Sequence, residues 1–231
     1  MALRHDIERI RDTALSSLGG AHDYFAYTRD VWRSLQQDVQ RHGRALQWRN
    51  LITGSVITET EVAARAQGYV EVELANSTLQ QFVSIFENFL FDSARAWILA
   101  YPDRIGKRQL TGKEIFALAD KAAIVNAVVE KELKDVFYDR PINWFQYLRD
   151  MVNITAPTAG DAERFAEIKA TRDVLVHGQG IANPYYVDKA GNLARAQPGG
   201  ILDVPGPYHQ ASWELIRKLV RTMGDEMAAK A

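Results

Sequence analysis

The stretch that decides the fold is LQQFVSIFENFLFDSARAW, residues 79–97. Its apolar side chains recur every three or four residues, at Leu79, Val83, Phe86, Leu90, Ala94 and Trp97. This spacing places them on one face of an α-helix. Charged residues interrupt the run at positions 87, 92 and 95, which predicts a helix of a protein core rather than a membrane span. We expect the aromatic side chains to be buried and Glu87 to be a solvated position.

Helical periodicity continues on both sides of this stretch. Two pairs with capping-box spacing, Thr58–Glu61 and Thr111–Glu114, predict helix starts, and Asp161 is a further expected N-cap. The pair Gly19-Gly20 is expected to end the first helix. The expected helices cover residues 4–18, 23–50, 58–100 with a possible break near Gly68, 111–136, 141–148, 161–177 and a last amphipathic segment that includes residues 215–223.

Residues 181–207 differ from the rest because they are rich in proline and glycine. Residues 185–193 within them predict a loop or a small hairpin. The fold class predicted from these patterns is all-α, an up-and-down helical bundle with one long Gly/Pro-rich loop before the last helix. We expect residues 1–55 to form an N-terminal helical extension packed on the bundle, and residues 56–231 to form the main helical domain.

Composition excludes several classes of protein. The chain has 231 residues, and 28 Lys+Arg against 29 Asp+Glu give a net charge of −1, which argues against a protein that coats DNA through bulk charge. The absence of cysteine excludes disulfide scaffolds, thiolate metal sites and cysteine nucleophiles. The first residues show no apolar leader, and no long apolar run occurs anywhere, so we expect a cytoplasmic protein that does not enter a membrane.

One segment, residues 168–178 (IKATRDVLVHG), combines groups suited to phosphate chemistry at the end of a predicted helix. Arg172 offers a fixed cationic fork that matches phosphate, and His177 is a titratable base in the last turn. Asp173 lies four residues before His177, where its carboxylate can orient the imidazole. Arg172 and His177 point about 140° apart on one helix. Two copies of the chain meeting across a two-fold axis would bring both groups to one cleft.

Other catalytic patterns are missing from the sequence. No Gly-rich phosphate loop follows a strand, no Gly-x-Ser-x-Gly elbow occurs, and the histidines never pair at helical spacing. We therefore expect no cofactor and no metal site.

The arrangement Arg172, Asp173, three apolar residues and His177 resembles the Arg-x4–6-His motif of the HEPN superfamily, the higher eukaryote and prokaryote nucleotide-binding domains. The earlier segment 82–90, apolar residues around an acidic one, resembles an early helix of that family, and the likeness extends over roughly residues 75–225. The resemblance implies a metal-independent endoribonuclease that acts as a homodimer. It makes His177 the general acid/base, Arg172 the phosphate clamp and Asp173 the polar helper. Many relatives carry Asn at the position of Asp173.

The resemblance also implies attack by the ribose 2′-OH, a 2′,3′-cyclic phosphate product, and a role as a toxin or antiviral-defence protein. An antitoxin protein is the partner that the toxin role would imply. The alternative is a catalytically inactive HEPN-like module that binds RNA, a nucleotide or a partner protein.

Further RNA contacts are expected at a basic cluster and at two tyrosines after the motif, namely Arg104, Lys107, Arg108, Tyr185 and Tyr186. Simpler interpretations stay open for each of these residues. Basic loop residues are often solvated, and tyrosines can pack a loop onto a bundle instead of stacking on bases. For Arg172 the alternative is a solvated side chain or one paired with an acid of another helix. For Asp173 it is an ion pair with Lys169, and for His177 a helix cap.

Overall fold

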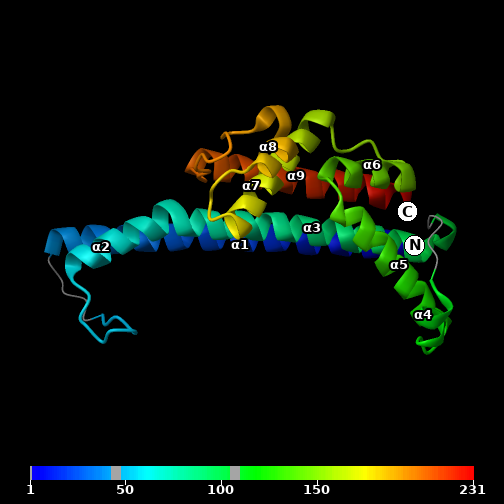
Figure 1. The fold of residues 1–231 in the computed structure, drawn as a ribbon, viewed down its shortest axis with the longest axis horizontal. Coiled ribbons are helices and arrows are strands. Elements are labelled where there is room, and N and C mark those ends of the chain that lie inside the picture. The colour runs from blue at the N-terminus through cyan, green and yellow to red at the C-terminus, as the bar shows by residue number, and fades with distance from the viewer. Residues whose placement is uncertain (1, 43–47, 105–109) are drawn as a thin grey trace.

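The structure, a computed structural model, describes residues 2–42, 48–104 and 110–231 (Figure 1). These residues form α-helices, short 3-10 and π-helical turns and two isolated β-bridges, but no sheet, so the all-α prediction is confirmed. The predicted boundary between residues 55 and 56 stays a prediction. The α-helices are α1 (Ala2–His42), α2 (Glu59–Gly68), α3 (Leu74–Ala100), α4 (Gly112–Phe116), α5 (Lys121–Tyr138), α6 (Pro141–Val152), α7 (Ala159–His177), α8 (Pro184–Ala190) and α9 (Gly206–Lys230).

The longest elements, α1 and α3, run antiparallel along the length of the molecule (Figure 1). The core lies where α3 packs against α1, α7 and α9. The aromatic residues predicted to be buried contribute to it: Phe82, Phe86, Phe89 and Trp97. Helices α2 and α3 are joined without a break by one π-helical turn, Tyr69–Glu73. Both predicted capping boxes are present, at Thr58–Glu61 and at Thr111–Glu114.

The prediction that Gly19-Gly20 ends a helix is wrong, because α1 runs through both residues. Buried side chains flank the pair on the inner face, with Leu18 and Ala21 packed in the core. The indole N–H of Trp213 on α9 donates to the carbonyl of Leu18 at 3.1 Å. These tertiary contacts outweigh the helix cost of two glycines, about 1 kcal/mol each.

Three further boundary predictions need correction. The helix expected over 111–136 is two helices, because the Asp120 carboxylate accepts from the Ala123 N–H and starts α5 anew. Thr158, not Asp161, caps α7. The loop or hairpin expected at 185–193 contains the short helix α8, where the Asn183 side chain accepts from the Tyr186 N–H.

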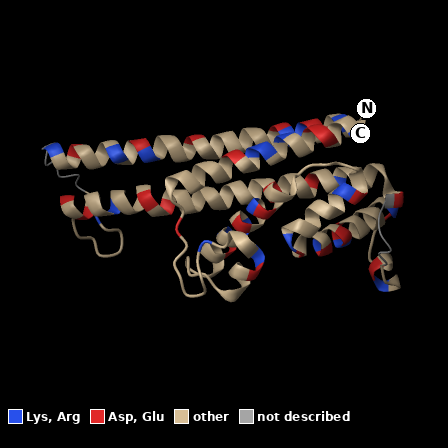
Figure 2. Ribbon diagram, turned by 90° about the horizontal axis from the view of Figure 1, so that it is seen from above, with Lys and Arg blue, Asp and Glu red and all other residues tan. Residues whose placement is uncertain are grey.

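Charged residues of both signs are interspersed along the helices rather than separated onto opposite faces (Figure 2). Within the parts of the chain that the structure describes, none of the helices combines the length and the apolar character needed to cross a bilayer.

Candidate functional site

The predicted catalytic residues lie together in a cleft of about 550 Å³ at the C-terminal half of α7. Helix α3 contributes Glu87 to it, and α8 with the residue before it forms another wall. Arg172 and His177 both line this cleft within a single chain, although their positions on an ideal helix differ by about 140°. The polar and charged lining residues are Glu87, Lys169, Arg172, Asp173, His177, Asn183, Tyr185, Tyr186 and Lys189.

Arg172 pairs with an acid of another helix. Its Nη2 donates to Oε2 of Glu87 at 2.5 Å. Its Nε is buried, lies 3.5 Å from Oδ1 of Asp173 and makes no hydrogen bond. The prediction that Glu87 is merely solvated is therefore wrong: the packing of α7 against α3 makes its carboxylate the partner of Arg172.

Asp173 does not orient His177 as expected. Its carboxylate instead accepts from Lys169 Nζ at 3.1 Å, which is the ion pair that its spacing also allowed, and lies 3.5 Å from Lys189 Nζ. The ring of His177 is exposed and makes no hydrogen bond or ion pair with the described residues. Either ring nitrogen of His177 is thus free to meet a ligand.

The cleft has an excess of positive charge before His177 is considered. Lys169, Arg172 and Lys189 face the carboxylates of Glu87 and Asp173. These pairs are partly exposed, with 16% of each of the Lys169 and Arg172 side chains accessible to solvent. An anion entering the cleft can therefore exchange with carboxylates that already hold the cations.

The two tyrosines after the motif differ in environment. The ring of Tyr185 is 76% exposed at the cleft, whereas Tyr186 is 2% exposed and packs in a small core between α7 and α8. The expected base contact of Tyr185 stays a prediction. Tyr186 instead takes the alternative role, because it is buried, packs its segment onto α7 and anchors α8. Of the basic cluster, only the backbone of Arg104 is described, at the end of the 3-10 turn Pro102–Arg104, and Lys107 and Arg108 lie outside the described residues.

A second polar cluster, the Glu167 cluster, lies buried beside the cleft and was not foreseen from the sequence. One oxygen of Glu167 accepts from the hydroxyls of Thr171 and Tyr186 and from Arg195 Nε, at 2.8 to 3.0 Å. The other accepts from the Tyr208 hydroxyl at 2.8 Å. Burial, with the nearby Glu167 charge, raises the pKa of both tyrosine hydroxyls, so they remain donors at ordinary pH.

The Glu167 cluster fixes the segment between α7 and α9. The guanidinium of Arg195 lies 3.7 Å from the centre of the Tyr208 ring, and its Nη1 donates to the carbonyl of Asp203 at 3.0 Å. The backbone N–H of Arg195 donates to the Tyr186 hydroxyl at 2.8 Å. These bonds hold α8 and its exposed residues in a set position at the cleft wall. Sequence spacing carried no signal for them, since Arg195 lies 28 residues from Glu167.

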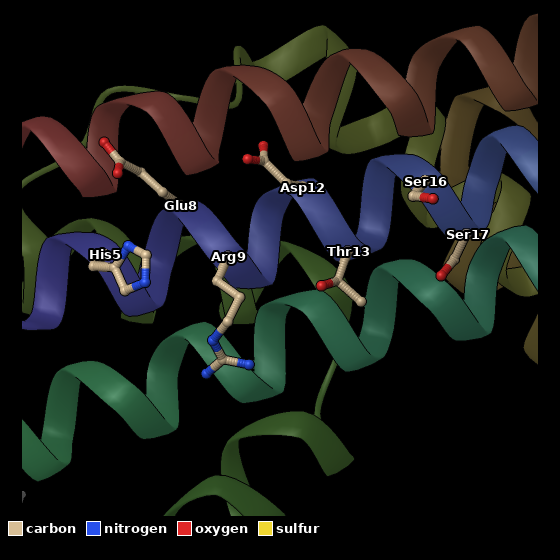
Figure 3. Close-up of a pocket in the computed structure, with 7 residues that line it drawn as sticks. All are labelled: His5, Glu8, Arg9, Asp12, Thr13, Ser16 and Ser17. Atoms are coloured by element: carbon tan, nitrogen blue, oxygen red, sulfur yellow. The ribbon is translucent and has the colours of Figure 1, made fainter.

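Another hollow, of about 600 Å³, lies on the outer face of α1 (Figure 3). It is lined by side chains of that one helix, including the small residues Thr13, Ser16 and Ser17. Its charged residues already pair locally, as in Arg4–Glu8 and Arg9–Asp6. Of the elements that the structure describes, only α1 brings chemical groups to this hollow, so the cleft at α7 is the better candidate site. Among the described residues, no group of His, Asp and Glu has an arrangement that could hold a metal ion.

Comparison of the chain with protein-family models, with curated proteins and with solved structures finds no match to any of them.

Proposed function

We propose that the chain is an endoribonuclease of HEPN type that needs no metal ion, and that Arg172 and His177 carry its chemistry. The observation that supports this most is their presence in one cleft with surplus positive charge. Phosphodiester transfer requires a group that holds the phosphate charge and a group that moves a proton. A guanidinium and an unengaged imidazole supply these two roles.

In the proposed reaction, His177 accepts the proton of a ribose 2′-OH, and the 2′ oxygen forms a bond to the adjacent phosphorus. The bond from phosphorus to the 5′ oxygen breaks, which leaves a 2′,3′-cyclic phosphate and a 5′-OH. Arg172 stabilises the extra charge on the phosphoryl oxygens after it exchanges Glu87 for the phosphate. In a homodimer whose α7 helices meet, the partner subunit's His177 can donate the proton to the leaving oxygen.

Cleavage of RNA in EDTA tests this function. Wild-type chain is expected to cut RNA, and His177→Ala to lose at least about 100-fold in rate, as for loss of a general acid/base. His5→Ala is a matched control, because His5 is also exposed but lines the hollow on α1. Equal cleavage by the two variants, or no cleavage by wild type at high concentration, would contradict the proposal. If the toxin role holds, expressing wild type but not His177→Ala slows cell growth.

The second candidate is a catalytically inactive HEPN-like module that binds RNA, a nucleotide or a partner protein. It is favoured by one feature of the cleft: Arg172 is already held by Glu87, and no carboxylate orients His177 among the described residues. RNA binding that Arg172→Ala weakens, without any cleaved product, would support this alternative.

A further inference from the structure

Helix α8 presents two side chains to the cleft that the proposed reaction does not use. Tyr185 and Lys189 are four residues apart, one turn of α8, and both line the cleft. The Tyr185 ring is largely exposed, and the Lys189 ammonium, 3.5 Å from Asp173, makes no hydrogen bond with it. An aromatic ring beside a loosely paired cation is the combination with which proteins hold an unpaired base and its phosphate.

The short helix contacts the rest of the protein on two sides, which gives its two exposed side chains a defined place. On its inner side the buried Tyr186 hydroxyl donates to Glu167 at 3.0 Å. On its outer side Asp188 accepts from Arg140 Nη2 at 2.6 Å, which ties α8 to the start of α6. A ligand therefore meets a preformed surface and does not have to order a loop when it binds.

The ion pairs of the cleft show which of its three cations is most available to bind a phosphate. Arg172 is engaged by Glu87, and Lys169 by both Asp173 and Glu87. Lys189 has the most exposed side chain of the three cations, at 41%, and supplies the excess positive charge of the cleft. The Lys189 ammonium can exchange Asp173 for a phosphate without leaving the Asp173 carboxylate unpaired, because Lys169 still pairs with Asp173.

We propose that Tyr185 and Lys189 bind one unpaired nucleotide beside the bond to be cut, with the base stacked on Tyr185 and a phosphate on Lys189. This inference rests on the proposed function and names its substrate class: single-stranded RNA or an unpaired loop. A base inside a duplex is stacked between its neighbours and is not available to the Tyr185 ring.

Binding of a 12-nucleotide unstructured RNA, followed by fluorescence anisotropy, tests this inference. All variants are made in a His177→Ala chain so that no RNA is consumed. Tyr185→Ala is expected to weaken binding on the order of 10-fold, the usual value of one stacked base, and Tyr185→Phe to leave it within about 2-fold. Lys189→Gln is expected to reduce the slope of log affinity against log salt by about 0.7, the value for one phosphate contact to a single strand.

Two variants serve as matched controls: Tyr27→Ala removes an exposed tyrosine of α1, and Lys113→Gln removes an exposed lysine of α4. Both are expected to bind like the parent. The same RNA annealed to its complement is expected to bind at least about 10-fold more weakly than the single strand.

The inference is overturned if Tyr185→Ala binds like Tyr27→Ala, or if duplex and single strand bind equally well. The parent His177→Ala chain showing no RNA affinity at all would overturn it too. Failure of the proposed function is seen separately, as absence of cleavage by the wild-type chain. Since Tyr185 is exposed, its variants should keep the thermal unfolding midpoint of the parent, which excludes misfolding as the cause of weaker binding.

Discussion

Helix α7 carries two ionic clusters that differ in burial and in how completely their polar groups are paired. The Glu167 cluster is buried, and its carboxylate accepts four hydrogen bonds from fixed donors. The second cluster, the Arg172 cluster, lies in the cleft and consists of Glu87, Lys169, Arg172, Asp173 and Lys189. There Arg172 Nε lacks a hydrogen bond, and the neighbouring His177 engages none of the described residues. A closed network stabilises one arrangement of the chain. A network with unpaired groups can exchange its partners for a ligand. For this reason the cleft, and not the buried Glu167 cluster, is the candidate site.

The substitution Glu167→Gln should have the largest effect on stability. The substitution removes the negative charge that pairs with the partly buried Arg195 guanidinium. It also replaces one carboxylate oxygen by an NH2 group, which cannot accept the hydrogen bond that the Tyr208 hydroxyl donates there. We expect a loss of about 3 kcal/mol in the free energy of unfolding, as for a buried pair that loses one partner. Urea unfolding measures it.

The control is Glu163→Gln on the same helix, where the side chain is exposed and little change is expected. Equal stability of the two variants would mean that the Glu167 cluster does not hold the segment between α7 and α9.

Acid should destabilise the protein through His209, a buried histidine that follows Tyr208 in the sequence. Its Nε2 lies 2.7 Å from the hydroxyl of Thr78, which itself donates to a backbone carbonyl, so Nε2 carries the proton and Nδ1 has no partner. Burial, together with the positive charges of His22 and Arg29, lowers the pKa of His209 to about 4. The unfolded chain, with an ordinary histidine pKa near 6.5, therefore binds the proton more readily.

The stability that neutral His209 contributes is complete above about pH 6.5 and falls as the pH drops from there to about 4, by about 3 kcal/mol in total. Denaturant unfolding at pH 7 and pH 4.5 measures this loss, and His209→Phe should reduce it. An identical loss in both proteins would assign the acid sensitivity to other groups.

The parts of this molecule that depend on local sequence were predictable. The apolar spacing of residues 79–97 predicts a buried helix, and the two Thr–Glu pairs predict helix starts that the structure contains. The error at Gly19-Gly20 has a physical cause: contacts with α3 and α9, distant in sequence, outweigh a local helix-breaking preference.

The site was predictable only in part for the same reason. Arg172 and His177 belong to one short segment, which made their chemistry predictable. Their positions were not, because the sequence led us to expect that two copies of the chain would be needed to bring them to one cleft, whereas both line a cleft of a single chain. Glu87 is 85 residues from Arg172 and Arg195 is 28 residues from Glu167, so no spacing rule links them. Lys189 enters the cleft because α8 forms where a loop or hairpin was expected, and that helix depends on the buried anchor Tyr186.

Glu87→Gln should have the smallest effect on stability and the most informative effect on binding. The Arg172–Glu87 pair is partly exposed and Gln can still accept one hydrogen bond, so we expect a change of at most about 1 kcal/mol in the free energy of unfolding. This contrasts with the loss expected for the same substitution at Glu167. In the His177→Ala chain, single-stranded RNA should bind about 3-fold more tightly, because one competing carboxylate no longer neutralises Arg172. Anisotropy at low and high salt measures this gain, which screening should reduce. Weaker binding would instead mean that Glu87 positions the guanidinium for the phosphate, and the cleft would then be as preorganised as the Glu167 cluster.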